Sequence, residues 1–278
     1  TIGYEQLAVD LTAFMAQNES DENVKKALDF ALLEDFDHLY RYANLLDCDY
    51  GTHAERLVGK YTEITPGRPT FAYHRLPEDN VKKPVNPQTA QTRTMLNTMI
   101  ITAAEQQTMN FYMNAGTYYK NEAGKRLYQE ICLVEEEHVT QYGSLIDCTA
   151  SLLESGLWHE YTECYIYWSN YLTETDERMK KIWEYYFELE LSQTAPANCL
   201  KNTRKKSTTR LLKTPSFPNP YASLLISAMC VACLKTPCNT QASLPIISPC
   251  LRLKTPIRFL FITKNSTTRL NKTRRTAL

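Results

Sequence analysis

The last 88 residues of this 278-residue chain contain neither aspartate nor glutamate. All 31 acidic residues lie at or before Glu190, where only 16 Lys and Arg occur, so that part has a net charge of −15. The remainder carries 15 basic residues and a net charge of +15. Because roughly 12% of an average protein sequence is Asp or Glu, so long an acid-free stretch excludes one domain of uniform composition.

The sequence also has no recognisable secretion signal and no long apolar run. Residues 1–18 have no basic n-region and no small-residue cleavage site. The longest apolar stretch, residues 221–234, is too short to span a bilayer. We therefore expect a cytoplasmic protein without membrane or nucleic-acid partners, in which the nine cysteines are mostly reduced.

The acid-free part, residues 194–278, is rich in Lys, Thr, Pro and Ser and shows no amphipathic periodicity. Short strings recur in it: Lys-Thr-Pro begins at positions 213, 235 and 254, and Ser-Thr-Thr-Arg-Leu at 207 and 266. A single Cys-x-x-Cys, at Cys230 and Cys233, has no second such pair to complete a metal site. Two interpretations stay open: non-native sequence from out-of-frame or read-through translation, and a natural basic disordered tail.

What the acidic part does have is one pattern of acids and a histidine that occurs twice, displaced by 100 residues. In each copy an acid is followed after 30 residues by a second acid, and three residues later by a histidine. The first copy is Glu5, Asp35 and His38, and the second is Glu105, Glu135 and His138. Flanking positions coincide too, for example Gln6 with Gln106 and Cys48 with Cys148. A repeat of this kind predicts a two-fold arrangement.

The spacing within the first copy predicts a helical hairpin. Residues 4–17 and 24–47 have apolar side chains at helical intervals, and the polar run between them offers Ser20 and Asp21 as N-caps. This run is centred on residue 20, midway between the two acids of the copy. A hairpin that turns there returns both acids to the same level.

The second copy breaks in the same way at residues 120–124, so two hairpins predict an all-α four-helix bundle over residues 1–150. The proline-broken link at 49–91 suits a long crossover along the bundle. We expect a shortened first helix, because Glu5 stands near the start of the sequence. Aromatic segments within 151–193, at 152–173 and 175–192, are predicted as further helices that pack on the bundle or form an oligomer contact such as a homodimer.

The repeated residues are suited to binding metal. Residues three apart share a helix face, so Asp35 and His38, and the same pair in the second copy, can each direct an oxygen and a nitrogen to one point. With the leading acid of each copy, four carboxylates and two imidazoles can hold two divalent cations, two acids bridging. The carboxylates offset the cations' charge in a buried core, and ligands without thiolate favour two Fe or two Mn ions.

This order of ligands resembles the ferritin-like superfamily, in particular its rubrerythrin and manganese-catalase-like branches. The matching residues are Glu5, Asp35-x-x-His38, Glu105 and Glu135-x-x-His138. The resemblance covers about residues 1–150 and implies a non-haem di-iron or di-manganese centre that acts on peroxide or O₂, with an electron-donor protein as a partner. Asp35 stands where the family has Glu, and Thr108 stands where rubrerythrins carry an additional ligand.

Two other functions fit the same pattern. One is iron oxidation, storage or buffering, as in ferritins, and the other is a structural bundle without a working metal site. Tyr42 and Tyr142 lie one turn after the histidines on the same face. They are candidates either for hydrogen-bond donors that orient the ligands or for core packing.

Overall fold

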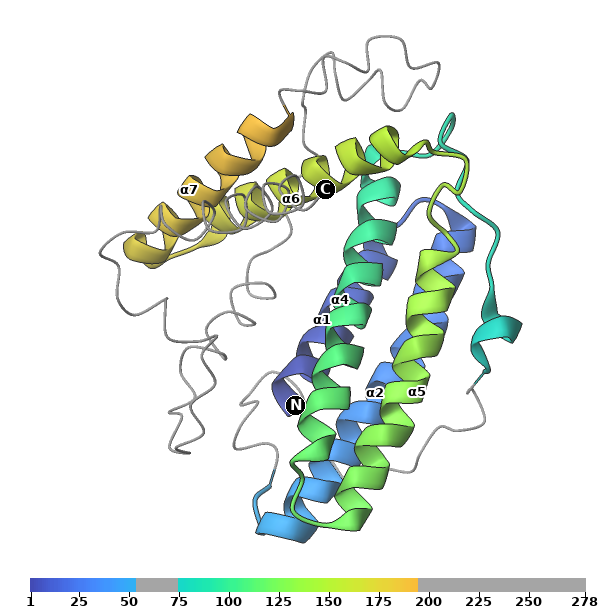
Figure 1. Ribbon diagram of the computed structural model, residues 1–278, viewed down its shortest axis with the longest axis vertical. Coiled ribbons are helices and arrows are strands. Elements are labelled where there is room, and N and C mark those ends of the chain that lie inside the picture. Colours follow the sequence, from blue (N-terminus) through green and yellow to red (C-terminus); the bar gives the residue numbers. More distant parts are fainter. Residues whose placement is uncertain (54–74, 195–278) are drawn as a thin grey trace, which may run out of the picture. The chain divides into compact units, whose positions relative to one another are not determined.

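The computed structural model describes residues 1–53 and 75–194. Within these ranges it holds six α-helices, one short 3-10 helix and no β-strand, which confirms the all-α prediction for this part of the chain (Figure 1). No helix in these ranges is long and apolar enough to cross a membrane. The middle of the predicted crossover, residues 54–74, and the predicted tail from residue 195, including its Cys-x-x-Cys, lie outside the described residues.

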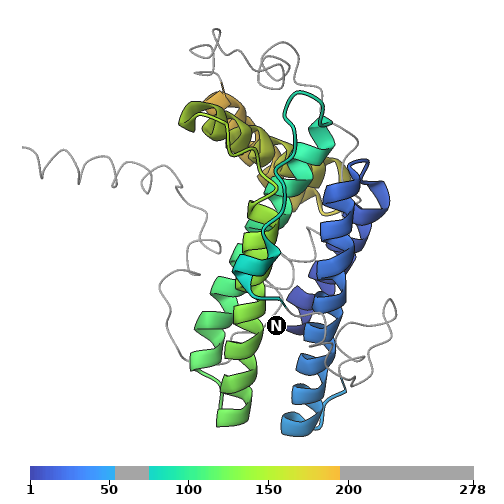
Figure 2. The ribbon, with the colours of Figure 1, turned by 90° about the vertical axis from the view of Figure 1, so that its right-hand side faces the viewer.

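The first two helices form a hairpin in which α1 (Ile2–Asn18) and α2 (Glu22–Tyr50) lie side by side (Figures 1 and 2). Of the two predicted N-caps, Asp21 is the one used: its carboxylate accepts hydrogen bonds from the backbone N–H groups at positions 23 and 24. Helix α2 ends at Gly51, whose φ of 59° lies in the left-handed region that glycine adopts without strain. Both helices extend beyond the predicted spans.

The second hairpin consists of α4 (Thr92–Thr117) and α5 (Glu122–Gly143), which lie beside each other in both views (Figures 1 and 2). The break predicted at 120–124 corresponds to the turn between them. Asn121 caps α5, because its side-chain oxygen accepts a hydrogen bond from the backbone N–H of Gly124.

Two buried apolar clusters join the hairpins, and each contains residues from both. The first includes Met15, Leu28, Leu96 and Leu145, and the second includes Val9, Leu39, Tyr112 and Ile131. Along α2, the acidic and histidine positions fall between Leu28 and Leu39. Burial of these side chains supplies the main driving force for association, and it holds the polar residues between two apolar layers.

Two further helices follow, α6 (Leu152–Thr173) and α7 (Glu177–Thr194). Helix α6 begins with a capping box, in which Ser151 and Glu154 each bind the other's backbone N–H. Trp158 and Tyr165 of α6 belong to the first apolar cluster, so α6 shares a core with the hairpins. Helices α6 and α7 pack through aromatic stacking, with the rings of Tyr167 and Tyr186 5.4 Å apart.

The α6–α7 contact is expected to weaken as the pH rises. Burial and a hydrogen bond with Glu160 raise the pKa of Glu190 to about 7. Because this pKa is higher in the folded than in the unfolded chain, stability falls as the pH rises through the range between the two values. Glu190→Gln should therefore raise Tm by about one or two degrees at a pH near 8 and leave it unchanged near pH 4. Thermal unfolding followed by circular dichroism measures this.

Glu188→Gln is the matched control, because Glu188 is exposed on the same helix. It should leave Tm unchanged at both pH values. Equal effects of the two substitutions would show that Glu190 makes no pH-dependent contribution to the contact.

Candidate metal centre

The structure brings the six repeated side chains together between the hairpins, and none is more than 1% exposed. Helices α1 and α4 supply one acid each, and α2 and α5 each supply an acid and a histidine. In two groups the ligand atoms all lie within 4.8 Å of one another. The first group is Glu5, Asp35 and His38, and the second is Asp35, Glu105 and His138.

Two of the four carboxylates lie between the two halves of the centre. Asp35 belongs to both groups. The two oxygens of Glu135 face the two histidines, with Oε1 3.0 Å from Nδ1 of His38 and Oε2 3.2 Å from Nδ1 of His138. The centres of the two imidazole rings are 5.8 Å apart. Asp35 and Glu135 are therefore the two carboxylates that face both halves of the centre.

Several of the ligand atoms of these residues have no hydrogen bond. Buried atoms with no hydrogen-bond partner in the described part of the chain include one oxygen each of Glu5, Asp35, Glu105 and Glu135, both nitrogens of His38, and Nδ1 of His138. A buried polar atom without a partner costs about 1–3 kcal/mol. So many of them at one place are explained if they coordinate a cation, and the residues present thus fit a metal ion.

Burial and the two histidines shift the pKa values of the acids in opposite directions. Burial, and then the neighbouring carboxylates, raise the pKa values of Glu5 and Glu105 well above the usual range. Burial also raises the pKa of Asp35, to about 6. Burial acts in the same direction on Glu135, but the two histidines outweigh it and hold its pKa below the usual range. Without metal, Glu135 is therefore the carboxylate of the four that ionises most readily.

Three residues that the sequence pattern did not indicate contact the ligands and support their positions. Oε2 of Glu34 lies 3.0 Å from Nε2 of His138, which leaves Nδ1 of that ring directed to the centre. Tyr112 donates a hydrogen bond to Oε1 of Glu5, and Thr12 donates one to Oδ2 of Asp35 over 3.2 Å. Positions 12 and 112 correspond in the 100-residue repeat, and this correspondence could have identified the two residues from the sequence.

The structure places Tyr42 and Tyr142 near the centre but not as donors to it. Both are buried, and neither hydroxyl has a hydrogen-bond partner among the described residues. The ring of Tyr142 lies 6.3 Å from that of His138. Of the two roles considered for these tyrosines, the observed contacts agree with packing.

The other acids close to the motifs have different surroundings. Glu136 is exposed. Asp37 lies 3.7 Å from Arg41. Glu137 accepts a hydrogen bond from Asn80, at the end of the 3-10 helix η2 (Pro77–Asn80). Of the acids in and next to the two motifs, those at the repeated positions are therefore the ones that meet at the centre.

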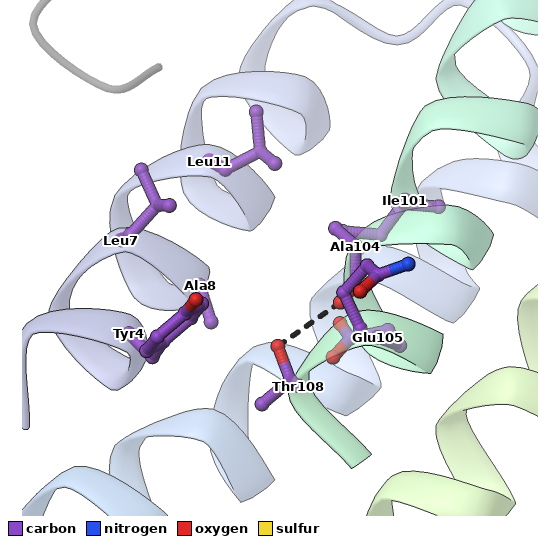
Figure 3. Close-up of a pocket in the computed structure, with 9 residues that line it drawn as sticks. Tyr4, Leu7, Ala8, Leu11, Ile101, Ala104, Glu105 and Thr108 are labelled. Carbon is purple, nitrogen blue, oxygen red and sulfur yellow. Dashed lines mark hydrogen bonds between the residues drawn. The ribbon is translucent and has the colours of Figure 1, made fainter. Parts of the chain in front are cut away.

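A small cleft between α1 and α4 leads to one ligand of the centre (Figure 3). It has a volume of about 20 Å³, enough for one water-sized molecule. Its walls are mostly apolar: Leu7, Ala8 and Leu11 from α1, and Ile101 and Ala104 from α4. Glu105 borders it together with Thr108, whose hydroxyl is bonded to the backbone oxygen of Ala104 (Figure 3).

Comparison with protein-family models, with curated proteins and with solved structures finds no match to this chain. The function of the site therefore rests on its own geometry and chemistry.

The described cysteines are all free of disulfides: Cys48, Cys132, Cys148 and Cys164. The pair that matches in the repeat, Cys48 and Cys148, therefore forms no disulfide.

Proposed function

We propose that residues 1–150 form a ferritin-like four-helix bundle that holds two iron or two manganese ions and acts on peroxide or O₂. One observation carries this proposal: two groups of buried acids and histidine share Asp35, and several of their donor atoms have no hydrogen bond. Oxygen and imidazole donors without a thiolate favour these metals. Bound there, the ions supply the capacity to gain and lose electrons that peroxide or O₂ reduction requires.

The chain's own residues hold and orient this centre. Glu5 and His38 would hold one ion, Glu105 and His138 the other, and Asp35 and Glu135 both. Tyr112, Thr12 and Glu34 fix the directions of the ligands that they contact. The apolar layers on either side keep bulk water from the ligands, and the α1–α4 cleft gives a small neutral molecule a route to Glu105.

Peroxide turnover tests the proposed activity. The full chain is loaded separately with Fe²⁺ and Mn²⁺, freed of unbound metal by gel filtration, and assayed for loss of H₂O₂ and uptake of O₂. The loaded chain should consume one of these oxidants, whereas the His38→Ala/His138→Ala variant, treated in the same way, should match buffer alone. A chain that holds two ions per molecule and reacts with neither oxidant would refute the proposed activity.

Filling the cleft should slow this reaction. Ala104→Leu adds three carbons to a cavity that accommodates one water-sized molecule, so the oxidant loses its route and turnover should fall several-fold at unchanged metal content. Ala103→Leu is the control, because Ala103 is exposed on the same helix and does not line the cleft. Equal rates in the two variants would place the route elsewhere.

A further inference from the structure

One face of α1 and one face of α4 line the cleft beside the centre. On each helix the lining includes residues at positions i, i+3, i+4 and i+7, which share one face of a helix: Tyr4, Leu7, Ala8 and Leu11 from α1, and Ile101, Ala104, Glu105 and Thr108 from α4. The two rows come from different hairpins and lie on either side of the cleft (Figure 3). The cleft therefore belongs to the contact between the hairpins and not to the surface of one helix.

The polar side chains of α4 that line the cleft have their polar groups engaged elsewhere. The hydroxyl of Thr108 donates a hydrogen bond to the backbone oxygen of Ala104 over 3.0 Å. Oε2 of Glu105 lies 3.9 Å from Nδ1 of His138, so this carboxylate is turned toward the centre. Gln107 is exposed, so its amide is hydrated by bulk water. The surface that remains for the inside of the cleft is almost entirely carbon.

Such a space does not suit water or hydrogen peroxide. A buried water typically makes about three hydrogen bonds, and peroxide would lose its hydrogen bonds to bulk water without replacement, which costs free energy. Apolar cavities in proteins instead stay dry and accept apolar molecules such as xenon. Dioxygen is apolar and has no strong hydrogen bonds to lose, and a volume of about 20 Å³ leaves room for one small molecule. The lining therefore favours dioxygen over peroxide.

The repeat shows that the cleft lies on one side of the two-fold arrangement. Tyr4 is the counterpart of Ala104, and Phe111 is the counterpart of Leu11. The rings of Tyr4 and Phe111 stack with their centres 4.8 Å apart, so large side chains occupy these positions on the side of the first copy's acid. On the other side, next to Glu105, the same positions hold alanine and leucine. The smaller pair leaves the approach to Glu105 open.

We propose that the α1–α4 cleft is a binding site for dioxygen, and that dioxygen rather than peroxide is the oxidant that reaches the centre through it. The role as oxidant rests on the proposed function, whereas binding needs only the walls of the cleft. A molecule bound there lies next to Glu105, which is a ligand of the proposed centre. The apolar walls keep peroxide and water in the bulk phase, so they determine the substrate class of the site.

Relaxation caused by dissolved dioxygen tests the site in the metal-free full chain. Dioxygen is paramagnetic, so methyl protons beside a bound molecule relax faster under oxygen than under the same pressure of nitrogen. Ile101 and Ile131 form a matched pair, because they are 1% and 0% exposed and only the first of them lines the cleft. We expect the increase in methyl relaxation, measured by nuclear magnetic resonance, to be several-fold larger at Ile101 than at Ile131.

Closing the cleft should remove this difference. Ala104→Leu fills the space with a larger side chain and should lower the oxygen effect at Ile101 to the level at Ile131. Ala103→Leu is the control, because Ala103 is exposed on the same helix and does not line the cleft; it should leave the effect unchanged. Circular dichroism confirms that both variants are folded. An oxygen effect at Ile101 no larger than at Ile131 in the native chain, or one that persists undiminished in Ala104→Leu, would overturn the site.

Hydrogen peroxide tests the preference for dioxygen. Added to the metal-free chain at the concentration used for dioxygen, it should leave the methyl chemical shifts of Ile101 unchanged, as at Ile131. A saturable shift at Ile101 alone would contradict this preference. Because no metal is present, these results do not depend on turnover. A chain that binds dioxygen in the cleft but consumes no oxidant when loaded with metal would refute the proposed activity and support the site.

Discussion

Loading the metal-free full chain with two Fe²⁺ or two Mn²⁺ ions should raise its Tm by about 16–32 °C. At a free concentration near a thousand times Kd, each bound ion adds about 4 kcal/mol to the free energy of unfolding. In a folded domain of this size, each kcal/mol raises Tm by about 2–4 °C. The effect should be large because the ions replace an unfavourable state, in which six buried side chains leave donor atoms without partners. Differential scanning calorimetry with and without metal measures it.

His38→Ala should remove about half of this metal-dependent increase, because His38 belongs to only one of the two groups. His159→Ala is the control, because His159 is exposed on α6 and belongs to neither group of the centre; it should retain the full increase. An undiminished metal-dependent rise in His38→Ala would mean that His38 binds no ion.

Two isosteric substitutions at the centre should change the stability of the metal-free chain in opposite directions at neutral pH. Glu135→Gln should lower the free energy of unfolding by about 3–5 kcal/mol, because it removes a carboxylate next to the buried His138, whose raised pKa favours the charged ring. Glu105→Gln should raise it by about 1–2 kcal/mol, because burial already raises the pKa of Glu105 and disfavours its charged form. Urea unfolding followed by circular dichroism gives both values.

Glu136→Gln controls for the loss of one negative charge on α5, since Glu136 is exposed next to Glu135. It should change the free energy of unfolding by less than about 0.5 kcal/mol. Both substitutions at the centre should also reduce metal binding, so Glu105→Gln would gain stability while losing metal. Changes of the same sign in Glu135→Gln and Glu105→Gln would contradict the division of charge described for the metal-free centre.

The sequence predicted the helices well where local chemistry determines them. The polar run around residue 20 and the break near residue 121 became the two hairpin turns, since Asp21 and Asn121 cap the helices that follow. The convergence of the six repeated residues was predictable too, because hairpins centred midway between two acids return them to one level. That argument needs only helix geometry and the 100-residue register.

Contacts between helices far apart in the sequence could not be predicted in the same way. The acid that contacts Nε2 of His138 is set by the rotation of α2 against α5. The sequence around Glu34 does not indicate that Glu34 makes this contact. Tyr112 reaches Glu5 across the two hairpins, where the repeat has the shorter Thr12. Tyr42 and Tyr142 lie on the expected helix face, yet their hydroxyls do not reach the carboxylates. Helical periodicity places a residue on a face but does not determine its partner.

Metal content per chain tests the central claim most directly. The full chain and its His38→Ala/His138→Ala variant are dialysed against Fe²⁺ or Mn²⁺, freed of unbound metal, and analysed by inductively coupled plasma mass spectrometry. The account predicts two ions per wild-type chain and none retained by the variant. Two ions in both proteins, or none in either, would contradict a centre built from the two groups that share Asp35.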